Sequence, residues 1–133
     1  MTDVELTRAL ERCEVPNEGF RHRDHLRVAC VYLQESPTVS DALARMTATL
    51  RRFAASVGKA EKYSDAITAF WMYQVASARA MMPDADCEAI VRAYPRLLDK
   101  HAVLAYYSGD APAPGAADSS RDAPDRSLPR RSP

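Results

Sequence analysis

The sequence predicts an all-α fold, a single compact bundle of five or six short helices followed by a disordered C-terminal tail. Apolar residues recur every three or four positions along most of the 133 residues, which is the period of a helix. No stretch shows the period of two that is typical of a strand. Prolines and glycines fall between the periodic stretches, where helices end.

The composition changes at Gly109. Residues 109–133 contain five of the nine prolines and two of the four glycines, and Leu128 is their only large aliphatic residue. Such a segment cannot bury enough apolar surface to offset the entropy lost on ordering. We therefore expect a helical domain at residues 1–108 and a disordered tail, rich in Pro, Ala, Ser and Arg, at residues 109–133.

Charge and composition exclude several partner classes. The formal net charge is zero, and because acids and bases also balance in the tail, the helical domain is neutral. It lacks the basic surface that nucleic-acid or anionic-membrane binding requires, and no apolar run approaches the roughly 20 residues that cross a bilayer. The start is too acidic for a signal peptide, and the three scattered cysteines are typical of reduced thiols. We expect a cytoplasmic protein.

The first two helices are predicted at residues 3–14 and 23–35. Thr2 or Asp3 is placed to cap the first, whose apolar residues lie on one side. The second ends before Pro37, because the residue preceding a proline is pushed out of the α region.

The third helix is predicted at residues 41–57, with Ser40 as its N-cap and Gly58 after its end. Its apolar residues repeat with the helical period, so one face should be buried. That face consists of Leu43, Met46, Leu50, Phe53, Ala54 and Val57.

A fourth helix is predicted at residues 66–81, with Ser64 or Asp65 as its N-cap. Its expected buried residues are Ile67, Phe70, Trp71, Val75 and Ala78. A short fifth helix should follow Asp84 or Asp86 and end near Tyr94. A last one should run from Asp99 to about Tyr107.

His22 and His25 form the clearest candidate site. Three positions apart at the start of the second helix, they would lie on one face about one turn apart. Two imidazoles at this spacing can bind a divalent transition metal, although a working site needs a third ligand. The candidates for that ligand are Glu18, Asp65 and His101.

Two other interpretations of the same residues remain open. A helix N-terminus with Arg21, Arg23 and Arg27 nearby could hold a carboxylate or phosphate instead of a metal. In the purely structural interpretation, His22 and Asp24 cap the helix, and His25 is a half-buried side chain of the apolar face.

A second candidate feature lies at the start of the fourth helix. Tyr63, Thr68 and Trp71 place an indole and two hydroxyl groups there, and Thr68 and Trp71 share a face. Such residues, with Asp24, would suit a pocket for a small-molecule ligand. The alternative is that Phe70 and Trp71 belong to the core and Thr68 is only tolerated within the helix.

One motif resembles the opening of a group of small, largely uncharacterised bacterial proteins: Phe-x-His-x-Asp-His-Leu-Arg-x-Ala-x-x-Tyr-Leu at residues 20–33. The resemblance continues through Lys-Tyr-x-x-x-Ile-Thr at residues 62–68 and covers most of residues 18–108. In that group a histidine usually follows the tyrosine of the second motif and would be the third partner of His22 and His25. This chain has Ser64 there, which implies a different ligand, weaker metal binding or a lost activity.

The sequence thus predicts a small metal- or anion-binding protein that acts on a small molecule through His22 and His25, and leaves open whether it is an enzyme. A bound metal would act as a Lewis acid or redox centre. Without a metal, a histidine would be the acid–base group. The alternative is a non-catalytic interaction module or accessory protein of a biosynthetic or regulatory system, which forms a homodimer or binds a protein partner.

Overall fold

The computed structural model describes residues 1–102, and over this range the predicted all-α fold is confirmed. The chain divides into two units after residue 100, and the first, residues 1–100, contains every element named below. The helices are α1 (Asp3–Glu11), α2 (His22–Glu35), α3 (Val39–Ser56), α4 (Asp65–Met81) and α5 (Cys87–Ala93), with short 3-10 turns η1 (Asn17–Gly19), η2 (Ala60–Lys62) and η3 (Pro95–Leu98). The predicted tail and the last predicted helix beyond residue 102 lie outside the described residues.

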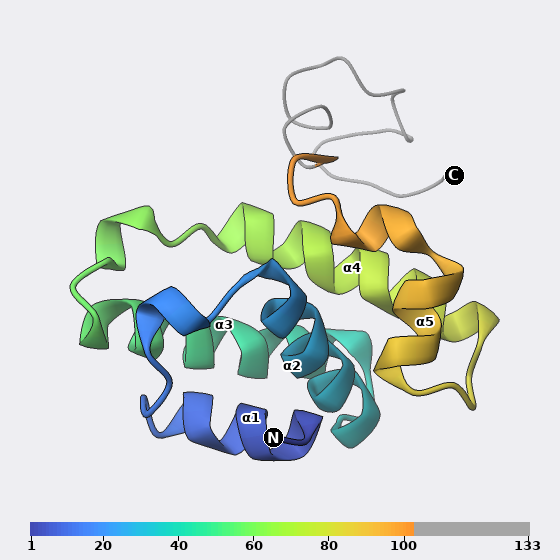
Figure 1. Ribbon diagram of the computed structural model, residues 1–133, viewed down its shortest axis with the longest axis horizontal. Helices are drawn as coiled ribbons and strands as arrows, with labels where there is room; N and C mark the ends of the chain where they lie inside the picture. The colour runs from blue at the N-terminus through green and yellow to red at the C-terminus, as the bar shows by residue number, and fades with distance from the viewer. Residues whose placement is uncertain (103–133) are drawn as a thin grey trace. The chain divides into compact units, whose positions relative to one another are not determined.

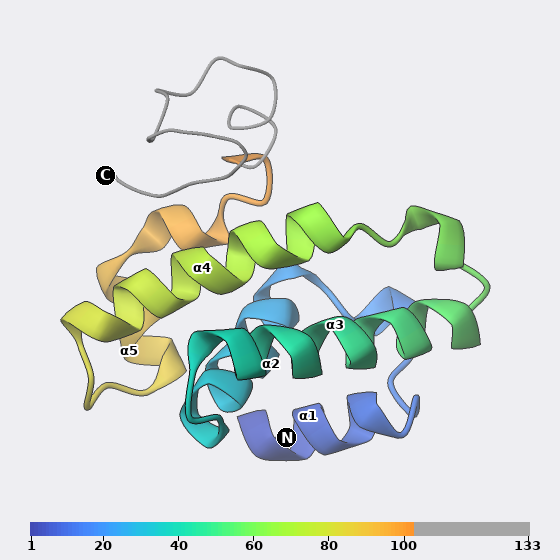
Figure 2. The ribbon, with the colours of Figure 1, turned by 180° about the vertical axis from the view of Figure 1, so that it is seen from behind.

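Helix α2 is the centre of this arrangement. It packs against α1, α3 and α4, and its other neighbours are α5 and η3 (Figures 1 and 2). As a result, the start of α2 lies among segments that are distant in the sequence. Within residues 1–102, no helix has both the length and the apolar character needed to cross a membrane.

Side-chain caps begin four of the helices. Thr2, Ser64 and Asp86 each accept a hydrogen bond from a main-chain N–H in the first turn, and each is one of the two caps predicted for its helix. The prediction of Ser40 as the cap of α3 is wrong. Thr38 takes this role, because its extended backbone lets Oγ1 accept the N–H three residues later at 3.0 Å.

Helix α1 ends at Glu11, three residues before its predicted end. Cys13 adopts the left-handed conformation, with φ of 57°. Its N–H donates to Leu10 O, and the N–H of Glu14 donates to Ala9 O, both at 2.9 Å. These two bonds form a Schellman motif, which satisfies the last carbonyls of the helix and turns the chain away.

The core is built around α2, whose Tyr32 is fully buried. On α3 the predicted face is confirmed at Met46, Leu50 and Phe53, while Leu43, Ala54 and Val57 are half-buried. Polar Thr49 is buried as well, which the apolar pattern did not predict.

The predicted buried face of α4 is wrong in part. Val75 and Ala78 are buried together with Met72, but Ile67 is exposed, and Phe70 and Trp71 are only half-buried. The reason is that α4 carries apolar residues nearly all round, so its sequence does not single out one face.

Candidate functional site

The start of α2 is organised by Asp24. Its Oδ2 accepts the main-chain N–H of Arg21 at 3.1 Å, which satisfies a donor at the helix start. Its Oδ1 accepts from Arg27 Nη1 at 3.3 Å. Asp24 therefore has the capping role that was one of its two predicted roles, and both of its oxygens have protein partners.

His22 is held by contacts with two other elements, η3 and α4. Its Nε2 is 2.8 Å from the main-chain oxygen of Leu97 in η3, so this nitrogen carries the proton and donates it. Its ring also lies against the indole of Trp71 in α4, with centroids 4.4 Å apart and planes at 64°. Burial lowers the pKa of His22, and the bond to Leu97 only partly opposes this effect.

His25 is held by the two residues that directly precede α2, Phe20 and Arg21. Its Nδ1 donates to the main-chain oxygen of Arg21 at 3.1 Å, and its ring centroid is 4.4 Å from that of Phe20. Phe20 in turn packs edge-on against Phe53 of α3. Burial lowers the pKa of His25, and the nearby His22 lowers it further. Both predicted histidines thus lie in the first turn of α2, each held by its own contacts.

The protonation state of the pair follows from these contacts. Because burial lowers both pKa values from the ordinary value of histidine, the neutral form of each ring is favoured near pH 7. Each ring has one nitrogen bonded to a main-chain carbonyl, which leaves Nδ1 of His22 and Nε2 of His25 as acceptors. Neither acceptor has a hydrogen-bond partner within residues 1–102. A neutral imidazole held in this way can bind a metal or accept a proton.

The described part of the chain offers no third ligand beside them. Within residues 1–102, no three His, Cys, Asp or Glu side chains converge as metal ligands would. Of the predicted third ligands, Asp65 is paired with Arg51, and Glu18 lies exposed in η1. His101 belongs to the second unit of the chain.

Ser64, where the resembling group has a histidine, has a clear structural role. Its hydroxyl caps α4 by accepting the N–H of Ile67 at 3.2 Å. Its main-chain oxygen accepts the hydroxyl of Thr68 at 3.0 Å. Thr68 is therefore bonded within its own helix, as the structural alternative predicted.

Of the second predicted group, Trp71 contacts His22. Neither Tyr63 nor Thr68 hydrogen-bonds to His22 or His25 in the described part of the chain. The hydroxyl of Tyr63 is buried without any hydrogen-bond partner within residues 1–102. A buried hydroxyl of this kind is unusual and marks a position where a ligand or water could donate or accept.

Of the three arginines near the start of α2, Arg27 has a structural role and is not available to bind an anion. Arg27 donates to Asp3 Oδ1 and to the main-chain oxygen of Met1, each at 2.6 Å, in addition to Asp24. Its guanidinium is therefore occupied by the N-terminal segment. Arg21 and Arg23 remain exposed at the helix start.

Two contributors to the site were missed from the sequence. Leu97 acts through its main-chain carbonyl, which leaves no trace in the pattern of side chains. Phe20 could have been found, since it is an aromatic residue in the same motif as the histidines.

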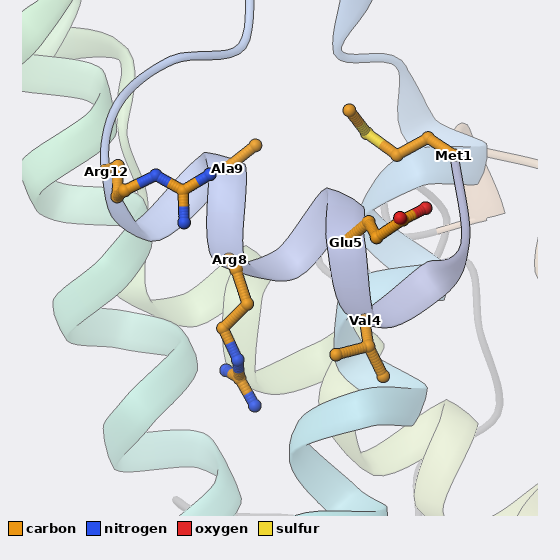
Figure 3. A pocket seen from close by; sticks show the side chains of 6 residues that line it. All are labelled: Met1, Val4, Glu5, Arg8, Ala9 and Arg12. Atoms are coloured by element: carbon orange, nitrogen blue, oxygen red, sulfur yellow. The ribbon is translucent and has the colours of Figure 1, made fainter.

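A separate hollow of about 530 Å³ lies on the outer surface of α1 (Figure 3). It is lined by Met1, Val4, Glu5, Arg8, Ala9 and Arg12, none of which is a predicted site residue. Because its walls come from α1 and the residues before and after it, this hollow does not bring distant functional groups together.

Comparison with known proteins gives no independent assignment. No protein-family model matches the chain, and no match is found among curated proteins or solved structures. The resemblance of residues 20–33 to the bacterial group therefore stays an expectation. The contacts of His22 and His25 are the remaining basis for proposing a function.

Proposed function

We propose that this chain binds a divalent transition metal through His22 and His25 and, through the metal, a small molecule. One observation supports this most directly: each imidazole donates one N–H to a main-chain carbonyl and keeps its other nitrogen as an acceptor. Metal-binding histidines are typically oriented by such a second hydrogen bond, which fixes the tautomer and the direction of the free lone pair.

The electrostatics favour metal over anion binding. Metal ligation requires neutral imidazole, and the lowered pKa values of both histidines keep them neutral at pH 7. An anion would instead be favoured by imidazolium and by a free Arg27, whose donors are already bound. The charge state of the two histidines and the contacts of Arg27 therefore favour metal binding over anion binding at this site.

With His22 and His25 as the ligands proposed from residues 1–102, coordination positions remain for a third protein ligand and for a small molecule. A bound transition metal would supply Lewis-acid or redox chemistry there. This chain would orient the two imidazoles through Leu97 and Arg21 and cover them with the rings of Trp71 and Phe20. Without a metal, the same neutral imidazoles would serve as general bases. The three free thiols also fit a reducing, cytoplasmic location.

The test is elemental analysis of the full chain purified without an affinity tag, followed by titration with Zn²⁺, Ni²⁺ or Fe²⁺. We expect about one bound metal per chain, the stoichiometry of a mononuclear site. His22→Gln/His25→Gln should abolish it, and a substitution of the exposed Tyr73, Tyr73→Phe, is the control that should retain it. The proposal is overturned if the folded chain binds no metal, or if the double variant binds as much as the native protein.

A second candidate function is an interaction module. One observation favours it: α4 leaves large apolar side chains in solvent, with exposed fractions of 44% for Ile67, 51% for Tyr73 and 73% for Met81. Such side chains can bind a second copy or another protein. Light scattering after size exclusion would support this function if the chain is a dimer that Tyr73→Lys dissociates, and a monomer would count against self-association.

A further inference from the structure

Two buried thiols lie together between α2 and α5. Cys30 on α2 is 7% exposed, and Cys87 at the start of α5 is 6% exposed. The sulfur of Cys87 is 3.6 Å from the main-chain oxygen of Leu26. In a regular α-helix this same oxygen accepts the N–H of Cys30, so Cys87 reaches the turn of α2 that carries Cys30.

The two thiols also interact with each other. Their hydrogen bond is the largest influence on the pKa of both groups: it raises that of Cys30, as burial also does, and lowers that of Cys87. The lowered pKa of Cys87 favours Cys87 over Cys30 as the thiolate of the pair. The thiolate is the nucleophile in exchange with disulfides, so Cys87 is the residue that reacts first.

We propose that Cys30 and Cys87 form a reversible disulfide between α2 and α5 by exchange with a small-molecule disulfide of the glutathione type. The thiolate of Cys87 attacks one sulfur of that molecule, which breaks its S–S bond and releases one small thiolate. Cys30 then loses its proton and attacks the Cys87 sulfur, which releases the second thiolate. The protein is oxidised by two electrons, the small disulfide is reduced to two thiols, and the two protein protons go to those thiols.

The fold makes this exchange selective. Cys13, the third cysteine, lies in the Schellman turn after α1, away from both partners in sequence and on a different element. Both members of the pair are covered, so the reagent enters when the seven-residue helix α5 opens locally. Once closed, the disulfide joins α5, and with it the adjoining η3, to the helix that carries His22.

The experiment uses the full chain with Cys13→Ser, so that only the two thiols of interest remain. The protein is equilibrated with oxidised and reduced glutathione, quenched with an alkylating reagent, and measured by intact mass and peptide mapping. We expect loss of two hydrogens, a linked peptide pair containing Cys30 and Cys87, full reversal by dithiothreitol, and a melting temperature several degrees higher in the oxidised form.

Single variants separate the two steps. With Cys30→Ser in the same background, exchange should stop at a mixed disulfide on Cys87, whereas Cys87→Ser should react more slowly at Cys30. Circular dichroism verifies that each variant is folded. Two results would overturn the proposal: both thiols remain open to alkylation after equilibration with oxidised glutathione alone, or the disulfide forms only in denaturant.

Discussion

The ring of His22 lies 4.4 Å from the indole of Trp71 between centroids, and this contact joins the start of α2 to the middle of α4. Trp71 is the single tryptophan of the chain. Because the two rings are adjacent, the fluorescence of the protein becomes a direct reporter on the charge of one histidine in the candidate site.

The first prediction concerns this fluorescence. A protonated imidazole quenches a neighbouring indole, so emission should fall as the pH decreases. The midpoint should lie below the ordinary pKa of histidine, because burial lowers the pKa of His22. A fluorescence titration of the native protein and of His22→Gln checks this, and the transition should vanish in the variant. A native midpoint at or above 6.5 would contradict the burial argument.

The second prediction concerns stability against pH. The folded-state pKa values of His22 and His25 are lowered, so the unfolded chain binds protons more readily than the native one. The contribution of the neutral rings is complete above the unfolded pKa of about 6.5 and is lost as the pH falls through the folded values. Urea unfolding between pH 7.5 and 5 should show a declining free energy, and His22→Gln/His25→Gln should flatten that decline relative to His101→Gln.

The third prediction concerns Tyr32, which is fully buried. Its hydroxyl bonds to Glu11 at 2.6 Å and to Thr49 at 2.8 Å, and burial raises its pKa to about 12. Tyr32→Phe leaves the buried hydroxyl of Thr49 without this partner, so the free energy of unfolding should fall by about 1–3 kcal/mol. Chemical denaturation measures this, with exposed Tyr73→Phe as the control that should change little.

The fourth prediction concerns Tyr63, whose buried hydroxyl has no partner in the described part of the chain. Removing an unsatisfied polar group relieves its desolvation cost, so Tyr63→Phe should leave the free energy of unfolding within about 0.5 kcal/mol or raise it. A loss as large as that of Tyr32→Phe would mean that this hydroxyl is bonded. If Tyr63 takes part in ligand binding, the variant should weaken binding while stability is kept.

The fifth prediction concerns Cys13 and its φ of 57°. A residue with a Cβ is strained in this conformation and glycine is not, so Cys13→Gly should raise the free energy of unfolding by about 1 kcal/mol. Cys13→Ala removes the thiol but keeps the Cβ, and it should show no comparable gain. If both substitutions changed the free energy of unfolding equally, the change would come from loss of the thiol and not from relief of backbone strain.

The fold class was predictable because the apolar period and the caps are local properties of the sequence. Three of the caps could be chosen from short polar side chains at helix starts. Thr38 and Ser40 illustrate the limit: both are hydroxyl residues just after Pro37, so cap chemistry does not distinguish them, and Thr38 is the one that caps α3. On α4 the apolar residues surround the helix, so only tertiary contacts determine its buried face.

The site was predictable to the extent that it consists of side chains within one motif. The spacing of His22 and His25 indicated a shared face, and Trp71 was singled out as a lining residue. The main-chain carbonyl that orients His22 could not be predicted, because any residue at position 97 would provide one. The role of Ser64 as a cap was predicted from helix chemistry, independently of the resemblance.

The hydrogen bond between His22 and Leu97 spans 75 positions of the chain, and it therefore determines when the site is completed during synthesis. Domains begin to fold from the N-terminus while translation proceeds at about 5 to 20 residues per second. Helices α1, α2 and α3 pack against one another and are synthesised before position 97. About 4 to 15 s therefore pass between the synthesis of His22 and the synthesis of its acceptor, Leu97. We expect α1, α2 and α3 to fold in the nascent chain before Leu97 can orient the imidazole of His22.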